Sequence, residues 1–330
     1  MPIALWQPSP EEQEKTLLTR FSKKVQERYE LSDCEYSTLH QWSIDYPELF
    51  WKEVWRDCEV RSSAEWSKVM SKSKFSEKIG TEPSGWFEGV RLNFAENLLA
   101  RGKDENEALC FTGENGSTSS LSYAELRDIV AKCASGLKSL GVSKNDRVAA
   151  VIPNCPEAVI GMLATASLGA IWSSCSPDFG INGIYDRLGQ ISPKILITVN
   201  AYYYNGKEHD CLLKIREIVI RIPSIESVFI VPFTETIIKF QGNEKAWGKL
   251  LNSSACTVNF AQLPFDHPLY ILYSSGTTGL PKSIVHGAGG TLLKHLTEHR
   301  YHTDVHPGDR IFFFTTCGWM MWNWLVSSLA

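Results

Sequence analysis

The clearest pattern in the chain begins at residue 108, where short apolar runs alternate with longer amphipathic stretches. The short runs are rich in β-branched residues and predict strands, while the longer stretches repeat apolar residues at helical spacing. Strands are predicted at Ala108–Thr112, Ser119–Leu121, Arg147–Ile152, Ile171–Ser174, Lys194–Val199 and Ser227–Val231, and helices at 123–140, after Asn154, at Gly183–Ile191 and at Leu212–Ile222. The alternation predicts an α/β fold, a layered helix–sheet–helix domain with a parallel sheet covered on both faces.

Local sequence signals predict where several of these elements begin and end. The turn at 113–116 joins the first two strands into a hairpin. Ser122 and Glu125 have the spacing of a capping box, and Gly141 ends the helix that follows. Asn154 and Glu157 predict the same kind of box for the next helix.

The first 105 residues have a different character, and we expect them to form a helical region with a strap that joins the main domain, residues 106–330. Apolar residues at helical spacing over 11–30 predict one amphipathic helix. A second helix is predicted at Tyr46–Val54, and the Lys/Ser alternation of 68–78 predicts a solvated face or loop. Residues 86–102 form the predicted strap and helix.

Composition narrows the class of protein. The chain has 330 residues and a net charge of −4, which offers no general attraction to nucleic acid or to an anionic membrane. The N-terminus lacks the basic start and apolar run of a signal peptide. Residues 158–177 are explained by a buried helix and strand, so no membrane span is predicted. Nine cysteines without a C-x-x-C pair indicate reduced thiols in a cytosolic protein.

The strongest chemical signal is the stretch LYILYSSGTTGLPK, which ends at Lys282. Leu269–Tyr273 predicts a buried strand, and 283–286 predicts a returning strand. The six residues between Tyr273 and Leu280 are all glycine or hydroxylated: Ser274, Ser275, Gly276, Thr277, Thr278 and Gly279. Such a loop presents backbone N–H groups and hydroxyls at close range, which suits a polyphosphate, and Lys282 adds a positive charge. The alternative is an ordinary Ser/Gly hairpin turn.

Pro281 stands where a G-x-x-x-x-G-K-[ST] loop needs its second glycine, which disfavours a P-loop NTPase. The run YSSGTTGLPK instead resembles the phosphate-loop signature of the adenylate-forming (AMP-binding) enzymes. This resemblance implies that residues 274–279 and Lys282 bind the phosphates of ATP and that Lys282 is catalytic. Segments 39–51 and 86–102 resemble acetyl-CoA-synthetase-type enzymes, which narrows the family to the short-chain acyl-CoA synthetases.

The tract CGWMMWNW near the end of the chain resembles the acetoacetyl-CoA synthetase branch of that family. The resemblance implies that Trp319, Met320 and Met321 line the acyl pocket. It also implies Mg²⁺-dependent reaction of acetoacetate with ATP and coenzyme A, giving acetoacetyl-CoA, AMP and pyrophosphate. Other short acids are an alternative. Gly206 and Lys207 stand where the family contacts coenzyme A, close to a predicted helix N-terminus, although Asn205 replaces a glycine and the preceding arginine is absent.

Members of this family continue for about as long again. The resemblance therefore implies that the adenine and Mg²⁺ motif, the ribose-binding aspartate and the small C-terminal domain are missing from these 330 residues. We expect an incomplete large domain and, as an alternative function, an inactive truncated isoform or fragment. Residues 319–330 are expected to lack packing partners and to expose an apolar patch.

Two further patterns are open to interpretation. His295, Glu298 and His299 spell H-x-x-E-H, which on a helix can hold Zn²⁺ with the glutamate as base; the alternative is a solvent-facing helix. Beyond that possibility we predict no metal centre made by protein side chains. Ile311–Thr315 predicts a strand in the buried core.

Overall fold

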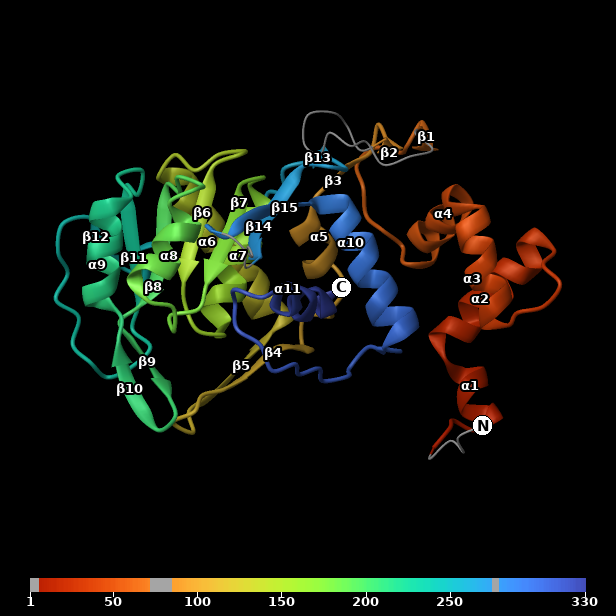
Figure 1. The fold of residues 1–330 in the computed structure, drawn as a ribbon, viewed down its shortest axis with the longest axis horizontal. Helices are drawn as coiled ribbons and strands as arrows, with labels where there is room; N and C mark the ends of the chain where they lie inside the picture. The colour runs from red at the N-terminus through yellow and green to blue at the C-terminus, as the bar shows by residue number, and fades with distance from the viewer. Residues whose placement is uncertain (1–5, 72–84, 275–278) are drawn as a thin grey trace.

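The computed structural model describes residues 6–71, 85–274 and 279–330. Its centre is a seven-stranded sheet in the order β12-β11-β8-β6-β7-β14-β15 (Figure 1). In chain order these strands are Arg147–Val151 (β6), Ile171–Cys175 (β7), Ile195–Val199 (β8), Ser227–Val231 (β11), Glu244–Ala246 (β12), Pro268–Ser274 (β14) and Lys282–Gly287 (β15). Every neighbouring pair is parallel except β14 and β15. The predicted parallel sheet is therefore confirmed, with one antiparallel strand at its edge.

The central strands are buried along their length, apart from Arg147 at the start of β6. This burial explains their near-continuous runs of valine, isoleucine and alanine, because a strand covered on both faces has no polar side to alternate with. Four helices accompany the sheet: Tyr123–Ser139 (α6), Pro156–Ser167 (α7), Ile181–Leu188 (α8) and Leu212–Arg221 (α9).

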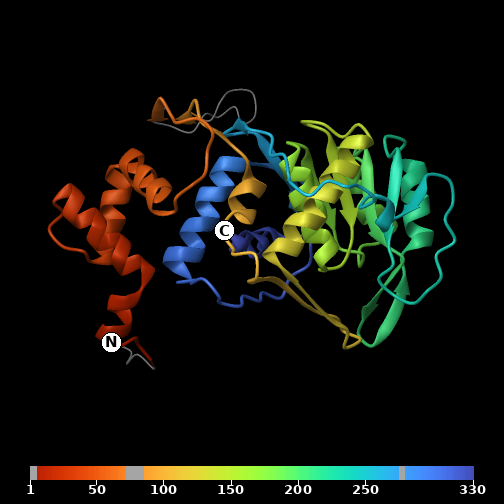
Figure 2. The ribbon, with the colours of Figure 1, turned by 180° about the vertical axis from the view of Figure 1, so that it is seen from behind.

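The connections place these helices on both faces of the sheet. The chain passes from β6 to β7 through α7, then returns across β6 to β8 through α8. Because crossovers between parallel strands are right-handed, reversing direction moves the helix to the opposite face. Helices α6 and α7 pack together, as do α8 and α9, and the two pairs lie on opposite sides of the sheet (Figures 1 and 2). The predicted helix–sheet–helix layers are confirmed.

Four helices form the N-terminal part of the described chain: Pro10–Lys15 (α1), Leu17–Tyr29 (α2), Tyr36–Asp45 (α3) and Pro47–Asp57 (α4). The single helix predicted over 11–30 is wrong, because Thr16 leaves the helical conformation and its side chain caps α2 by accepting from Thr19 N–H. Phe21 of α2 stacks on Tyr301 with ring centroids 4.5 Å apart. The Tyr301 hydroxyl donates to Asp57 at 2.7 Å, which ties these helices to the C-terminal half.

The strap consists of Trp86–Glu88 (β2), Arg91–Leu92 (β3) and Phe94–Leu99 (α5). Asn93 joins it to the main domain, because its buried amide donates to Ala166 O at 3.0 Å and Ala261 O at 2.9 Å. Lys68–Met70 (β1) pairs with β2, buries Val69 and leaves Lys68 exposed, so of the solvated face or loop predicted there the loop is wrong at its start. Residues 72–78 of that prediction lie outside the described residues.

Three small sheets and two C-terminal helices complete the described structure. The predicted hairpin at 108–121 is confirmed as Glu107–Thr112 (β4) with Thr118–Ser122 (β5). The other pairs and helices are Ala201–Tyr204 (β9) with Lys207–Asp210 (β10), Leu263–Pro264 (β13) with β3, Ala288–Thr297 (α10) and Met320–Val326 (α11). In the part of the chain that the structure describes, no helix is both long and apolar enough to span a bilayer.

Three local predictions have different outcomes. The Ser122–Glu125 capping box is confirmed. The box predicted at Asn154 is wrong, because Cys155 occupies the N-cap and Asn154 instead accepts from the Trp322 indole. The strand predicted at Ile311–Thr315 is wrong as well: this segment is extended but pairs with no strand among the described residues, and Phe312 and Phe314 are 80% and 88% exposed.

Candidate functional site

The β14–β15 ladder brings the two ends of the predicted phosphate loop together. Ser274 is the last residue of β14, and its Cα pairs directly with that of Lys282, the first residue of β15. The Lys282 side chain is exposed. Gly279 has φ +152°, a conformation that favours glycine. Ser275, Gly276, Thr277 and Thr278 lie outside the described residues.

A hydroxyl pair supports the base of this loop from within the sheet. Ser173 of β7 donates to Ile271 O at 2.9 Å, and its oxygen lies 3.2 Å from the hydroxyl of Tyr273. Burial raises the pKa of Tyr273, so the phenol stays protonated and available for hydrogen bonding. Strand β14, which leads into the loop, is therefore joined to β7 by side chains as well as by backbone.

The carboxyl edge of the sheet gathers a second predicted segment beside this loop. Strands β6, β7 and β14 are parallel, so their carboxyl ends lie along one edge. Ser174 of β7 donates to Cys317 O at 2.6 Å, and the Cys317 thiol lies 3.3 Å from Pro153 O after β6. The Trp322 indole N–H donates to Asn154 at 3.0 Å. The tract at 317–322 is thus fixed to the sheet edge at which the phosphate loop begins.

The predicted acyl-pocket residues follow this anchored turn. Trp319 is 66% exposed, while Met320 and Met321 are half-buried at the start of α11. Among the described residues, neither of the two best-defined cavities is lined by these three side chains. The acyl pocket stays a prediction. Trp322, Asn154 and Ser174 were not predicted as site residues, yet they fix the turn. Only their contacts across the fold identify them.

Gly206 and Lys207 lie apart from this edge cluster, on the tight turn between β9 and β10. Asn205 and Gly206 both have positive φ, at 52° and 70°, which is typical of a two-residue hairpin turn. The helix predicted to follow them is confirmed, because α9 begins at Leu212; strand β10 separates the turn from it. Gly206 N–H already donates to Glu114 on the neighbouring hairpin at 2.6 Å. A role for Lys207 toward coenzyme A stays a prediction.

The H-x-x-E-H residues are mostly buried, so the solvent-facing helix expected there is wrong. His295 Nδ1 lies 2.7 Å from the Ser327 hydroxyl, and His299 Nε2 lies 2.8 Å from Trp324 O. Glu298 forms an ion pair with Lys294 on the surface. Each histidine therefore contacts α11 or the turn after it, and among the described residues no group of three metal-type side chains gathers.

The patch expected from residues 319–330 is also wrong. Trp322, Val326 and Leu329 are buried, and the Tyr123 hydroxyl donates to Leu329 O at 3.0 Å. The 3-10 helix Ser327–Leu329, which follows α11, packs against α5 and α10. Large exposed aromatic side chains lie before α11, at Phe312, Phe314 and Trp319.

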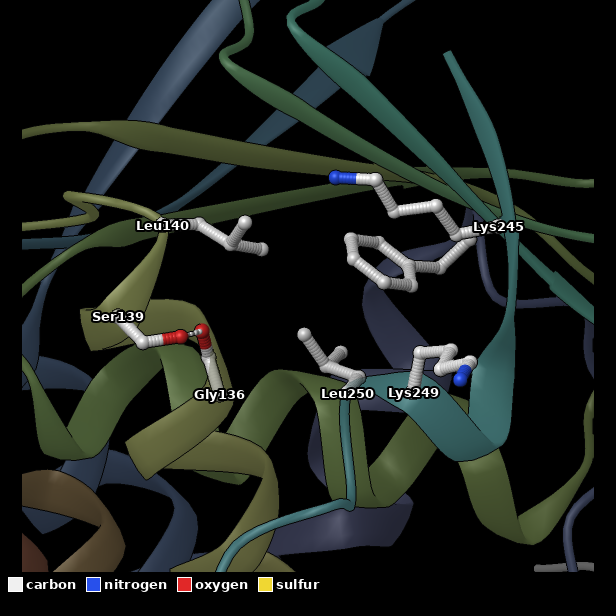
Figure 3. A pocket seen from close by; sticks show the side chains of 7 residues that line it. Gly136, Ser139, Leu140, Lys245, Lys249 and Leu250 are labelled. Carbon is white, nitrogen blue, oxygen red and sulfur yellow. Dashed lines mark hydrogen bonds between the residues drawn. The ribbon is translucent and has the colours of Figure 1, made fainter.

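A cavity of about 430 Å³ lies near the other edge of the sheet, between the end of α6 and strands β11 and β12 (Figure 3). Leu140, Leu250 and the Phe229 ring form its apolar walls, with Lys245 and Lys249 beside them. Lys245 donates to Ser227 at 3.1 Å. The cavity contains none of the predicted site residues and flanks the face of the sheet instead of the carboxyl ends of its strands, where ligands of such sheets bind.

Comparison with known proteins agrees with the resemblance seen in the sequence. Residues 98–329 match the family described as AMP-binding enzyme, and residues 36–98 match the acetyl-coenzyme A synthetase N-terminus. An acetoacetyl-coenzyme A synthetase of Rhizobium meliloti is 43% identical over 99% of this chain and 49% of its own length. A malonamoyl-CoA synthetase of Penicillium aethiopicum is 42% identical over 96% of this chain and 45% of its own length.

A solved structure agrees with the sequence relatives. The acetoacetyl-CoA synthetase from Streptomyces lividans has a TM-score of 0.92 and 40% identity, covering 99% of this chain and 50% of that one. The fold expected from the resemblance is therefore confirmed. The chain spans about half the length of the curated relatives it matches.

Proposed function

The chain belongs to the family of AMP-binding enzymes, and from that premise we propose that it supplies the phosphate-binding part of an ATP-dependent acyl-CoA synthetase. The carrying observation is the pairing of Ser274 with Lys282 at the sheet edge to which the 317–322 turn is also fixed. The acid must reach the nucleotide phosphate for the two to react. Attachment of the 274–282 loop and the 317–322 turn to the same sheet edge supports such a meeting.

The proposed reaction has two steps. A carboxylate oxygen attacks the α-phosphorus of ATP and expels pyrophosphate, which gives an acyl-adenylate; the thiol of coenzyme A then attacks the acyl carbon, loses its proton and expels AMP. The first step increases negative charge on the phosphate oxygens. In this proposal the Lys282 ammonium, the Ser274 hydroxyl and backbone N–H groups of the loop bind those oxygens; the pairing of Ser274 with Lys282 supports it. Mg²⁺ in such sites commonly binds substrate phosphates and neutralises part of their charge.

Acetoacetate is the proposed acid. Relatives named for acetoacetate and for malonamate have nearly equal identity to this chain, at 43% and 42%, so identity alone does not choose between them. Both acids carry a carbonyl at the same distance from the carboxylate. The proposal favours acetoacetate because the tract from Cys317 to Trp324 resembles that branch, and other short acids are the competing substrates.

Nucleotide binding tests the site directly. We expect Lys282→Ala to weaken MgATP binding to this chain by roughly tenfold or more, because it removes a charged hydrogen-bond donor. Lys239→Ala is the matched control, since it removes an exposed lysine from outside the predicted sites and should leave the Kd for MgATP unchanged. Isothermal titration calorimetry provides the measurement. Equal affinity of the Lys282→Ala and unaltered chains would refute the assignment.

Catalysis is tested by ATP–pyrophosphate exchange with acetate, propionate, malonamate and acetoacetate. The assay uses a polypeptide that also contains the half that the relatives have beyond the region matched by these 330 residues. We expect exchange to be fastest with acetoacetate. In that assay Lys282→Ala should slow exchange far more than it raises the KM for the acid. Conversion of ATP to ADP in place of AMP would contradict the proposed reaction.

A further inference from the structure

The residue after helix α8 reaches across to the exit of the phosphate loop. Gln190 follows the C-cap Gly189, and its side-chain amide donates to Pro281 O at 2.8 Å. Its side-chain oxygen accepts from the Ser283 hydroxyl at 3.1 Å. Pro281 and Ser283 are the two neighbours of Lys282, and they lie 91 and 93 residues from Gln190 along the chain. One side chain thus bonds to the backbone carbonyl before the predicted phosphate-binding lysine and to the side-chain hydroxyl after it.

The bonds to Gln190 fix which way its amide points. The same nitrogen also donates to Asp186 O in the last turn of α8, at 2.5 Å. Both N–H groups are therefore used on carbonyl oxygens, while the amide oxygen faces a hydroxyl donor. A reversed amide would place its oxygen against the two carbonyl oxygens, an arrangement with only acceptors. The hydrogen-bond pattern thus requires an amide at this position and disfavours a carboxylate.

The geometry has a consequence for Lys282. Successive side chains of a strand point to opposite faces, so Ser283 and Lys282 of β15 leave the strand on opposite sides. Gln190 holds Ser283 on the side of α8, which directs Lys282 to the other side. We propose that Gln190 is a positioning residue that sets the direction in which Lys282 meets the nucleotide phosphates; this rests on the proposed function.

Stability alone gives no reason for this contact. Gln190 and Ser283 are exposed, and hydrogen bonds open to water contribute little net stability because water replaces them when they break. The contact of Gln190 with Pro281 and Ser283 therefore affects mainly the direction of the Lys282 side chain. A variant that removes it is therefore expected to fold normally, which makes the inference testable.

The test compares three variants of the chain. Gln190→Ala removes the contact, and Gln190→Glu places a carboxylate against the two carbonyl oxygens. Asn182→Asp is the matched control, because it makes the same amide-to-carboxylate change on α8 at a side chain that accepts from Arg221. We expect the Kd for MgATP to rise severalfold in Gln190→Ala and further in Gln190→Glu. It should stay unchanged in Asn182→Asp, with all urea midpoints close to that of the unaltered chain.

Hydrogen exchange of the nucleotide-free chain gives a second readout that does not depend on ATP. Backbone amides of 282–284 should exchange severalfold faster in Gln190→Ala, and Ser283→Ala should add little in the Gln190→Ala background. Unchanged exchange at these amides, or an affinity order in which Gln190→Glu equals the unaltered chain, would overturn the inference. Faster exchange in a chain that never binds MgATP would support the contact itself while refuting the proposed function.

Discussion

Two buried histidines join α10 and the turn after it to the C-terminal helix. His295 contacts Ser327, and His299 contacts Trp324 through a hydrogen bond and a ring contact with centroids 4.3 Å apart. Burial lowers the pKa of His295 to about 3, and the nearby His299 adds to the effect. Burial also lowers the pKa of His299. Both rings are therefore neutral in the folded protein at neutral pH.

This burial predicts that acid destabilises the fold through His295. Between its ordinary pKa near 6.5 and about 3, the unfolded chain binds a proton that the folded chain does not, so stability falls as pH falls through this range. From pH 8 to pH 5 the loss attributable to this group is about 2 kcal/mol. Urea unfolding of the unaltered chain and of His295→Gln at both pH values measures it. Parallel losses in the two proteins would contradict the prediction.

Residue-scale prediction from sequence reaches only as far as local signals do. Ser274 and Lys282 are candidates because a six-residue run of small polar side chains before a lysine is informative by itself. The contacts of Gln190 and Asn154 were missed, because their partners lie 91 and 168 residues away. A hydrogen bond between distant segments leaves no periodic trace in sequence. The roles of residues 274–279, 282 and 319–321 stay predictions.

At the scale of elements, helix α11 depends on contacts with the sheet edge. Its Trp322 side chain is fully buried, and the indole N–H finds its acceptor in Asn154. Before this helix, Gly318 packs close to β7, where an added Cβ would lie 3.5 Å from Ser176 N. The short helix has seven residues, too few to be stable alone, so its place is set by these contacts.

The Trp322 contact predicts a measurable stability difference. Asn154→Ala removes the acceptor and leaves a buried N–H without a partner, which should lower the free energy of unfolding by about 1–3 kcal/mol. Asn154→Asp keeps an acceptor at the same exposed position and should retain most of the stability. Urea titrations that follow tryptophan fluorescence compare the two. Equal midpoints for Ala and Asp would show that the hydrogen bond contributes nothing.

Element boundaries were predictable only where side chains close in sequence bond to the free backbone N–H groups at a helix end. Ser122 and Glu125 cap α6 with their own side chains, so their spacing sufficed. Asn154 has similar spacing, but Trp322 takes its side-chain oxygen and Pro156 begins the helix without a box. At 311–315 the β-branched and aromatic composition favours extended backbone, yet a strand also needs a neighbour for its N–H and C=O groups.

At the scale of the whole molecule, two of the features that expose large apolar side chains are a sheet edge and the segment before α11. Strand β15 forms one edge of the sheet and exposes Ile284 and Val285, and the segment before α11 exposes Phe312 and Phe314. Exposed apolar surface and open strand edges both favour association with another chain. Trp322, Val326 and Leu329, near the end of the chain, are buried and do not add to it.

We therefore predict that the chain self-associates as its concentration rises, and that Phe312→Ser with Phe314→Ser reduces the association constant by roughly tenfold or more. Ile237→Ser is the matched control, because Ile237 is 83% exposed but lies far from this segment in sequence. Sedimentation velocity over a hundredfold concentration range measures the effect. Equal association of the double variant and the control would contradict it.

The shared edge of β6, β7 and β14 also bears on how such enzymes diversify. The loop from Ser274 to Lys282 and the turn from Cys317 to Trp322 reach it through separate passages of the chain. Under the proposed function, the turn can change, and with it the preferred acid, while the nucleotide-binding loop is preserved. For the protein engineer, grafting that single turn from a relative with another substrate is the most direct route to a new specificity.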